Sequence, residues 1–308
     1  MIAAVAAVHD PVMVSEAVAA LGCRPGGTWV DATVGAGGHA GAILAATAPD
    51  GFLVGIDRDE EALAIAGEQL APFAGRFVLV HGTFGDLAGV LARAGKGEVD
   101  GVLVDLGISS LQVDRAERGF SFRADAPLDM RMDRSRGTTA LELVRDAGEE
   151  ELADIIYAFG EERKSRRIAR AICRERDRGG ELTTARLAAV VAGAAGGGGP
   201  RSGRIHPATQ TFQALRIAVN RELEELEEIL AALPRLLAPG GRACVIAYHS
   251  LEDRAVKRAF RAWAHREDRR VPAPFELVTK KPLRPGDDEV ARNPRARSAR
   301  LRAVARAA

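Results

Sequence analysis

Short apolar segments in the first third of the chain alternate with helix-compatible segments, and this alternation limits the fold more than any other feature. The apolar segments cover residues 28–33, 52–57, 77–81 and 99–106. Segments that are apolar at nearly every position are typical of strands buried on both faces, which occur in parallel sheets covered by helices. The sequence therefore predicts an α/β fold built on a parallel sheet.

A further segment of this type, residues 242–248, follows only after a long interval without strand-like runs. Within that interval, residues 140–178 have a charged helical pattern, and residues 211–233 indicate one long acidic helix. Two late β-like stretches, 276–280 and 299–305, are expected to close the far edge of the sheet.

This order of segments indicates that the sheet is interrupted by an insertion. We predict a discontinuous sheet domain formed by residues 1–111 and 214–308. We predict an inserted helical domain at residues 112–213.

Composition excludes several classes of protein. At 47% hydrophobic and 28% charged residues, the chain can bury a large core. No apolar run approaches the roughly 18 residues of a membrane span, and the start lacks a basic leader. Cys23, Cys173 and Cys244 lie far apart without a CxxC pair, so neither a zinc site nor a disulfide framework is expected. We expect a cytoplasmic protein with no metal and no membrane partner; whether it forms a homodimer is left open.

A glycine-rich loop at residues 35–38 follows the first predicted strand. Glycines allow close approach of a ligand at the carboxyl edge of the sheet. Asp31 begins this loop, while Asp57 and Asp105 end the second and fourth strands, and Asp57 is placed to accept the hydroxyls of a ribose. The loop has neither a phosphate-binding Walker pattern nor the GxGxxG spacing. An acid-lined nucleoside pocket favours a positively charged ligand without phosphate, S-adenosylmethionine, over NAD.

Charge is unevenly distributed along a chain whose total is +1. Residues 1–111 have a net charge of −8, and residues 254–308 a net charge of +10. Arginines gather in two places, the helical pattern at residues 140–178 and the basic tail. In both places their positive charge suits the phosphates of RNA. A merely solvated helical face is the alternative for the first group. The candidate RNA-binding residues are Arg163, Arg166, Arg167, Arg170, Arg295 and Arg297.

A series of motifs carries a resemblance to a known family. They are GAGGH at 35–39, DLGISS at 105–110, ERGFSF at 117–122, PLDMRM at 127–132, YAFGEER at 157–163, HPATQTFQA at 206–214, HSLEDR at 249–254 and NPRARS at 293–298. Together they closely resemble the bacterial MraW-type 16S rRNA (cytosine-N4)-methyltransferase family, from about His9 to Arg302.

The resemblance implies a Rossmann-like class I methyltransferase sheet with an inserted helical substrate-recognition domain. It also implies S-adenosylmethionine as cofactor, and as substrate the N4 atom of a cytidine, usually numbered 1402, in the decoding centre of 16S rRNA in the small ribosomal subunit. Thr33 stands where methyltransferases commonly have the first glycine of the loop. The family's cofactor contacts fall here on Gly37, Gly38, His39, Asp57, Phe84, Asp105 and Gln112.

Two side chains are candidates for the catalytic proton acceptor. Asp105 suits either a cofactor contact or an acceptor for the target amino group. His249 suits either a base or a structural cap of the following helix. Desolvation without a base is a third option. Among other functions, a non-catalytic ribosome-assembly factor that retains the cofactor site is the main alternative, and a nicotinamide-dependent dehydrogenase is disfavoured by the loop spacing.

Overall fold

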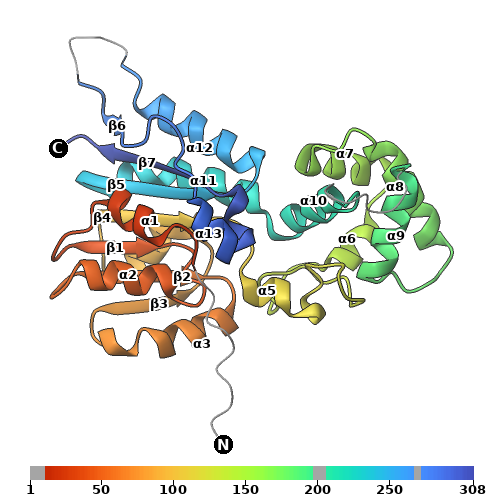
Figure 1. Ribbon diagram of the computed structural model, residues 1–308, viewed down its shortest axis with the longest axis horizontal. Helices are drawn as coiled ribbons and strands as arrows, with labels where there is room; N and C mark the ends of the chain where they lie inside the picture. The colour runs from red at the N-terminus through yellow and green to blue at the C-terminus, as the bar shows by residue number, and fades with distance from the viewer. Residues whose placement is uncertain (1–10, 197–205, 267–271) are drawn as a thin grey trace, which may run out of the picture. The chain divides into compact units, whose positions relative to one another are not determined.

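The computed structural model describes residues 11–196, 206–266 and 272–308, and the chain divides into two compact units (Figure 1). The first unit comprises Met1–Gly107 and Leu223–Ala308, and the second comprises Ile108–Glu222. The sequence prediction placed the breaks after residues 111 and 213. The second break falls later because helix α10 (Thr209–Asn220) packs within the core of the second unit.

The first unit is built on a sheet of order β3-β2-β1-β4-β5-β7-β6. Neighbouring strands from β3 to β5 are parallel, and β7 is antiparallel to both β5 and β6. The predicted parallel α/β sheet is therefore confirmed, and the two late stretches do close its far edge. The strands are β1 (Thr28–Asp31), β2 (Phe52–Asp57), β3 (Phe77–His81), β4 (Val99–Asp105), β5 (Leu237–Ala247), β6 (Phe275–Leu277) and β7 (Arg300–Arg306).

Two apolar cores lie on opposite faces of this sheet. Neighbouring strand residues alternate between them, as Trp29 and Val30 do in β1, because successive side chains of a strand point to opposite faces. One core is completed by α4 (Leu87–Arg93), α11 (Glu222–Leu236) and α12 (Ser250–Trp263). The other is completed by α1 (Val14–Leu21), α2 (Gly38–Ala46) and α3 (Glu60–Gln69).

The strand order reverses direction between β1 and β4, which are neighbours in the sheet. In open α/β sheets, ligands bind outside the carboxyl ends of the strands at such a switch point. Asp31 is the last residue of β1, and Asp105 is the last residue of β4. The topology therefore brings these two acids to the place where a ligand is expected.

Strand β7 returns several tail arginines to the sheet. Arg300 and Arg302 both pair with Asp253 of α12, at 3.0 and 2.7 Å, and hold the pKa of that carboxyl below its usual value. Arg306 pairs with Glu98 at 2.6 Å. Part of the positive charge of the tail is thus neutralised within the first unit, which the net charge of the segment did not show.

The second unit is helical. Its helices are α5 (Ser110–Asp114), α6 (Ala140–Asp146), α7 (Glu149–Gly160), α8 (Ser165–Asp177), α9 (Thr184–Ala194) and α10. They enclose a separate apolar core that includes Ile156, Ile168 and Phe212. The helical pattern predicted over residues 140–178 is confirmed by α6, α7 and α8. In the described ranges, no helix is long and apolar enough to cross a membrane.

The single helix predicted over residues 211–233 is wrong. Helix α10 ends at Asn220 and α11 begins at Glu222, with Arg221 in the left-handed region at φ 51°. The Asn220 side chain donates to the carbonyl of Arg216 and accepts the N–H of Met132, each at 2.8 Å. Because the Asn220 amide is held by these partners at the end of α10, its hydrogen bonds favour a break that the acidic pattern conceals.

Candidate active site

The loop between β1 and α2 is shaped by glycines. Gly37 has φ 95°, and a Cβ there would lie 3.4 Å from Cα of Ala66. A Cβ on Gly38 would lie 2.6 Å from the ring of Pro11. Larger residues at either position would require the surroundings to move. The loop ends at the first turn of α2, whose N–H groups favour an anionic ligand group such as a carboxylate.

Asp57 fastens this loop to the end of β2. Its Oδ2 accepts the N–H of Gly35 at 2.8 Å, and its Oδ1 accepts the N–H of Asp59 at 2.9 Å. Burial raises the pKa of the Asp57 carboxyl. Because each carboxylate oxygen has two acceptor positions, Asp57 retains capacity for two hydroxyl donors.

Asp31 presents an acceptor that the described residues do not satisfy. Its side chain is buried, Oδ1 accepts the N–H of Thr33 at 3.2 Å, and Oδ2 has no hydrogen-bond partner in the described part of the chain. Burial raises the pKa of Asp31 to about 7, although the nearby His39 opposes the shift. An unsatisfied buried acceptor is costly, so this oxygen fits a ligand that brings positive charge or N–H donors.

Asp105 lies in a network of polar groups at the end of β4. Its Oδ1 accepts the hydroxyl of Tyr248 at 2.9 Å, and its Oδ2 lies 3.8 Å from Nδ1 of His39. Burial raises the pKa of Asp105 to about 7; the Tyr248 hydrogen bond lowers that pKa, and the charge of Glu252 raises it further. A carboxyl that titrates near neutrality is suited to exchange a proton during a reaction.

The buried ring of His39 lies between the carbonyl of Val12 and the carboxyl of Asp105. Its Nε2 lies 2.9 Å from the carbonyl of Val12, so Nε2 is the nitrogen that donates a hydrogen there. In the neutral ring, Nδ1 then faces Asp105 as an acceptor. His39 therefore links the segment before α1 to the acid that ends β4.

Phe84 opens a short helix, η2 (Phe84–Asp86), after β3, and its ring is largely buried. The Arg58 guanidinium lies 5.5 Å from the ring centroid and 3.8 Å from Oε2 of Glu225. Glu225 also accepts the N–H of Gly85 at 2.8 Å. Sequence reasoning missed Arg58 and Glu225; that Arg58 directly follows Asp57 was the one available signal.

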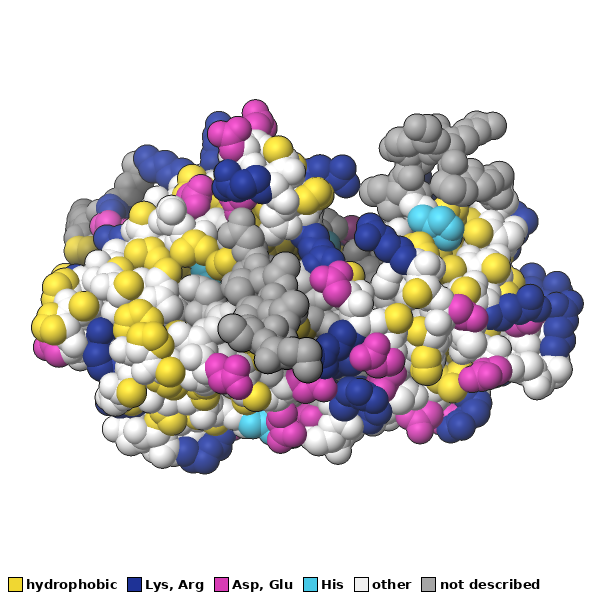
Figure 2. Space-filling model, turned by 60° about the horizontal axis from the view of Figure 1, so that its bottom comes forward, with side chains coloured by type: hydrophobic (Ala, Val, Ile, Leu, Met, Phe, Trp, Pro, Cys, Tyr) yellow, Lys and Arg dark blue, Asp and Glu magenta, His cyan; other side chains and the backbone are white. Residues whose placement is uncertain are grey.

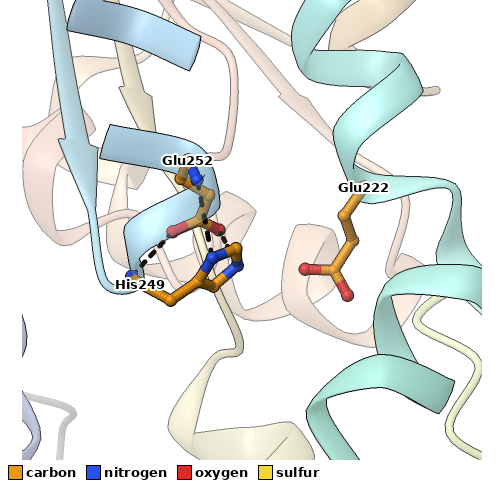
Figure 3. A group of neighbouring side chains, drawn as sticks. All are labelled: Glu222, His249 and Glu252. Atoms are coloured by element: carbon orange, nitrogen blue, oxygen red, sulfur yellow. Dashed lines mark hydrogen bonds and ion pairs between the residues drawn. The ribbon is translucent and has the colours of Figure 1, made fainter. Parts of the chain in front are cut away.

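His249 caps helix α12, as one of the two sequence-based options proposed. Its Nδ1 accepts the N–H of Glu252 at 3.5 Å, and Oε2 of Glu252 accepts the N–H of His249 at 3.2 Å. Its Nε2 lies 3.0 Å from Oε1 of Glu252, so the ring lies against this glutamate (Figure 3). Nδ1 is thus used by the cap, whereas the buried Nε2 makes no hydrogen bond among the described residues although it lies close to Glu252.

Gln112 belongs to the second unit. It lies on α5 in a capping box, where its Oε1 accepts the N–H of Ser109 at 3.2 Å. The side chain is buried. Its backbone and side chain are therefore held in place at the start of α5.

The candidate RNA-binding arginines of the second unit are exposed, although they are not equivalent. Arg166, Arg167 and Arg170 lie on α8, whereas Arg163 lies in the turn before this helix. Arg170 pairs with Glu149 at 3.1 Å. No carboxylate pairs with Arg163, Arg166 or Arg167 within the part of the chain that the structure describes.

In the tail, Arg295 and Arg297 are exposed on the short helix η4 (Pro294–Ser298). Basic and acidic side chains are interspersed over the face that Figure 2 shows. The segregation of charge along the sequence therefore does not produce one-signed regions on that face.

The described geometry defines a class of protein. A mostly parallel sheet whose switch point carries a glycine loop and buried acids is that of a Rossmann-like methyltransferase. The cofactor of such an enzyme is S-adenosylmethionine, and the unsatisfied Oδ2 of Asp31 fits this positively charged molecule.

The chain belongs to the MraW methylase family, whose model matches residues 6–307. It is 53% identical over 298 residues to the ribosomal RNA small subunit methyltransferase H of Sorangium cellulosum, covering 97% of this chain and 90% of that protein. It is 51% identical over 309 residues to the protein of the same name from Citrifermentans bemidjiense, covering 96% and 97%. A solved rRNA methylase from Streptococcus thermophilus is 11% identical with a TM-score of 0.44, covering 98% of this chain and 100% of that one.

Proposed function

We propose that this chain transfers a methyl group from S-adenosylmethionine to N4 of a cytidine in the decoding centre of 16S rRNA in the small ribosomal subunit. The observation that carries the proposal is the near full-length similarity to proteins named for small-subunit rRNA methylation, at half the residues or more identical. This function places the protein in the cytoplasm, where ribosomal subunits are assembled.

The proposed cofactor contacts are the residues that match the family's motifs, and contacts within the first unit support several of them. When bound, S-adenosylmethionine supplies an electrophilic methyl group on a sulfonium. Gly37 and Gly38 would admit its amino-acid part, Asp57 would accept the ribose hydroxyls, and Phe84 would add an apolar contact. His39 and Gln112 complete the proposed set with Asp105.

Asp105 is the residue to which we assign the target amino group. Cytosine N4 is a poor nucleophile because its lone pair is delocalised into the ring, so the amino group must be oriented by an acceptor. Oδ2 of Asp105 is the oxygen not engaged by Tyr248, and a pKa of about 7 allows the carboxyl to take the proton that is released. Positioning and a water-poor environment supply the remaining acceleration. His249 keeps its capping role.

The exposed arginines are proposed to contact RNA phosphates. Arg163, Arg166 and Arg167 are the first candidates because no described carboxylate neutralises them, and Arg170 is a weaker one because Glu149 does. Arg295 and Arg297 would add contacts from the tail. A base within folded RNA must also be turned out of its stack before N4 reaches the cofactor.

The test is transfer of label from S-adenosylmethionine to small subunits that lack the modification. The expected result is a labelled nucleoside with the mass and mobility of N4-methylcytidine. Bound cofactor with unlabelled rRNA would instead support a non-catalytic assembly factor, and label in another nucleoside would refute the assignment of the amino group.

A further inference from the structure

Tyr248 meets Asp105 because β4 and β5 are neighbours in the sheet. Asp105 pairs in register with Ile246, so Tyr248 lies just beyond the end of β5 and reaches back toward the acid. Its hydroxyl lies 2.9 Å from Oδ1 of Asp105. None of the sequence motifs assigned a role to this tyrosine.

The position of Tyr248 is fixed by contacts that do not involve Asp105. Its N–H donates to Oε2 of the buried Glu252 at 2.8 Å, and its ring packs against the apolar core on one face of the sheet. Gly107 has φ 103°, and a Cβ there would lie 3.1 Å from Cδ2 of the tyrosine ring. Glycine at position 107 thus leaves room for the tyrosine ring. Because the backbone and ring of Tyr248 are held by these contacts, its hydroxyl has a defined position next to Asp105.

The Tyr248 hydroxyl gives the two carboxylate oxygens of Asp105 different surroundings. Oδ1 accepts the hydroxyl of Tyr248, whereas Oδ2 lies 3.8 Å from Nδ1 of His39, beyond hydrogen-bond length. We propose that Tyr248 is a positioning residue for the methyl-transfer site, whose hydroxyl holds one oxygen of Asp105 so that the other is presented to the bound cofactor and the target amino group. This inference rests on the proposed place of Asp105 in the cofactor site.

The electrostatics of the cluster agree with this role. The pKa of Tyr248 is raised well above its usual value by burial and by Asp105, so the hydroxyl stays a donor. Its hydrogen bond lowers the pKa of Asp105 against the effect of burial, so loss of the hydroxyl should leave less of the carboxyl ionised at pH 7. The titratable groups that act on this pair are His39, Asp31, Cys244, Glu252 and Glu289.

The test measures binding of S-adenosylmethionine by calorimetry between pH 6 and 9, in the full chain and in Tyr248→Phe. The variant removes only the hydroxyl and keeps the ring packing. We expect roughly fivefold weaker binding at pH 7, because loss of the hydroxyl raises the pKa of Asp105 and leaves less of the carboxyl ionised. The defect should shrink to within about twofold at pH 9.

The matched control is Tyr157→Phe, which changes the other tyrosine of the chain, 62% exposed on α7. It should bind like the wild type at every pH. Equal loss in Tyr248→Phe at all pH values would indicate a packing role only and would overturn the inference, as would unchanged binding at pH 7. A wild type that does not bind the cofactor at any pH would overturn the proposed cofactor site itself.

Discussion

Oγ1 of Thr33 accepts the backbone N–H of Asp105 at 2.7 Å. Thr33 occupies the loop position where methyltransferases commonly have glycine, so the departure has a structural consequence. Its hydroxyl fastens the loop after β1 to the end of β4, across the switch point of the sheet. The acid at the centre of the proposed chemistry is thus held through its backbone by Thr33 and through its side chain by Tyr248.

Replacing Asp105 by Asn should abolish turnover while leaving the fold intact, because the amide keeps the shape but accepts no proton. We expect a loss of at least about 100-fold in methyl transfer at saturating cofactor and RNA, as is typical when a proton acceptor is removed. Wild-type turnover in this variant would show that Asp105 is not the proton acceptor.

The stability of the protein should decrease as pH rises toward 7. Asp105 and Asp31 have folded-state pKa values of about 7 against an ordinary value of 3.8, so between these values the folded chain binds more protons than the unfolded chain. This stabilisation is complete below about pH 4 and is lost as pH rises through 7. In Asp105→Asn the Tm should therefore fall less between pH 5 and 8.5, with Asp31 retaining part of the slope. The exposed Asp146→Asn should behave like the wild type, and a wild-type Tm that rises over this range would contradict the two raised pKa values.

Gly37→Ala should weaken cofactor binding, and Gly75→Ala is its matched control. Both glycines have positive φ, 95° and 84°, so both variants should lose about 1 kcal/mol or more of folding stability. A Cβ at position 37 would lie 3.4 Å from Ala66 Cα, whereas one at position 75 has nothing described within 4 Å. Only Gly37→Ala should therefore bind S-adenosylmethionine more weakly in a calorimetric titration. Equal affinity in the two variants would remove this loop from the cofactor site.

Reversing the charge of Arg166 and Arg167 together should weaken RNA binding without changing cofactor affinity. We expect at least about a tenfold loss at low salt, and a smaller dependence of RNA affinity on salt, because phosphate contacts are lost. Arg145→Glu is the control, since Arg145 is also exposed in the second unit but already pairs with Asp146 at 2.9 Å. Filter binding at several salt concentrations distinguishes the two, and equal RNA affinity in low and high salt would refute the electrostatic account.

The variants His249→Ser and His249→Ala distinguish between the two possible roles of His249, helix cap and catalytic base. Serine is a good helix N-cap and alanine is not, so Ala should destabilise the fold by about 1 kcal/mol more than Ser. Neither variant should lose turnover beyond what its stability explains. Full stability with abolished turnover in His249→Ser would make His249 the proton acceptor.

The strands of the sheet could be predicted closely because buried parallel strands are apolar at almost every position. The predicted segment at residues 52–57 coincides with β2, for example. The break at Arg221 was missed because it depends on hydrogen bonds of Asn220 to Met130 and Met132, far away in the sequence. The role of Tyr248 was missed for a similar reason, since its partner is set by the order of strands and not by local spacing.

For the tail, the sequence suggested more arginines for RNA binding than the structure supports. Arg300 and Arg302 belong to a basic segment that suggested RNA binding, yet both are engaged by Asp253. Composition counts charges but not their partners, so the share of the tail in RNA binding now rests on Arg295 and Arg297.

Locating the methyl group in the rRNA tests the proposed function most directly. Undermodified small subunits would be incubated with the protein and labelled S-adenosylmethionine, and the rRNA digested to fragments whose masses are sequenced. We predict one labelled fragment, from the decoding centre, with the methyl group on N4 of a cytidine. A methyl group elsewhere in the rRNA, or none in the presence of bound cofactor, would contradict it.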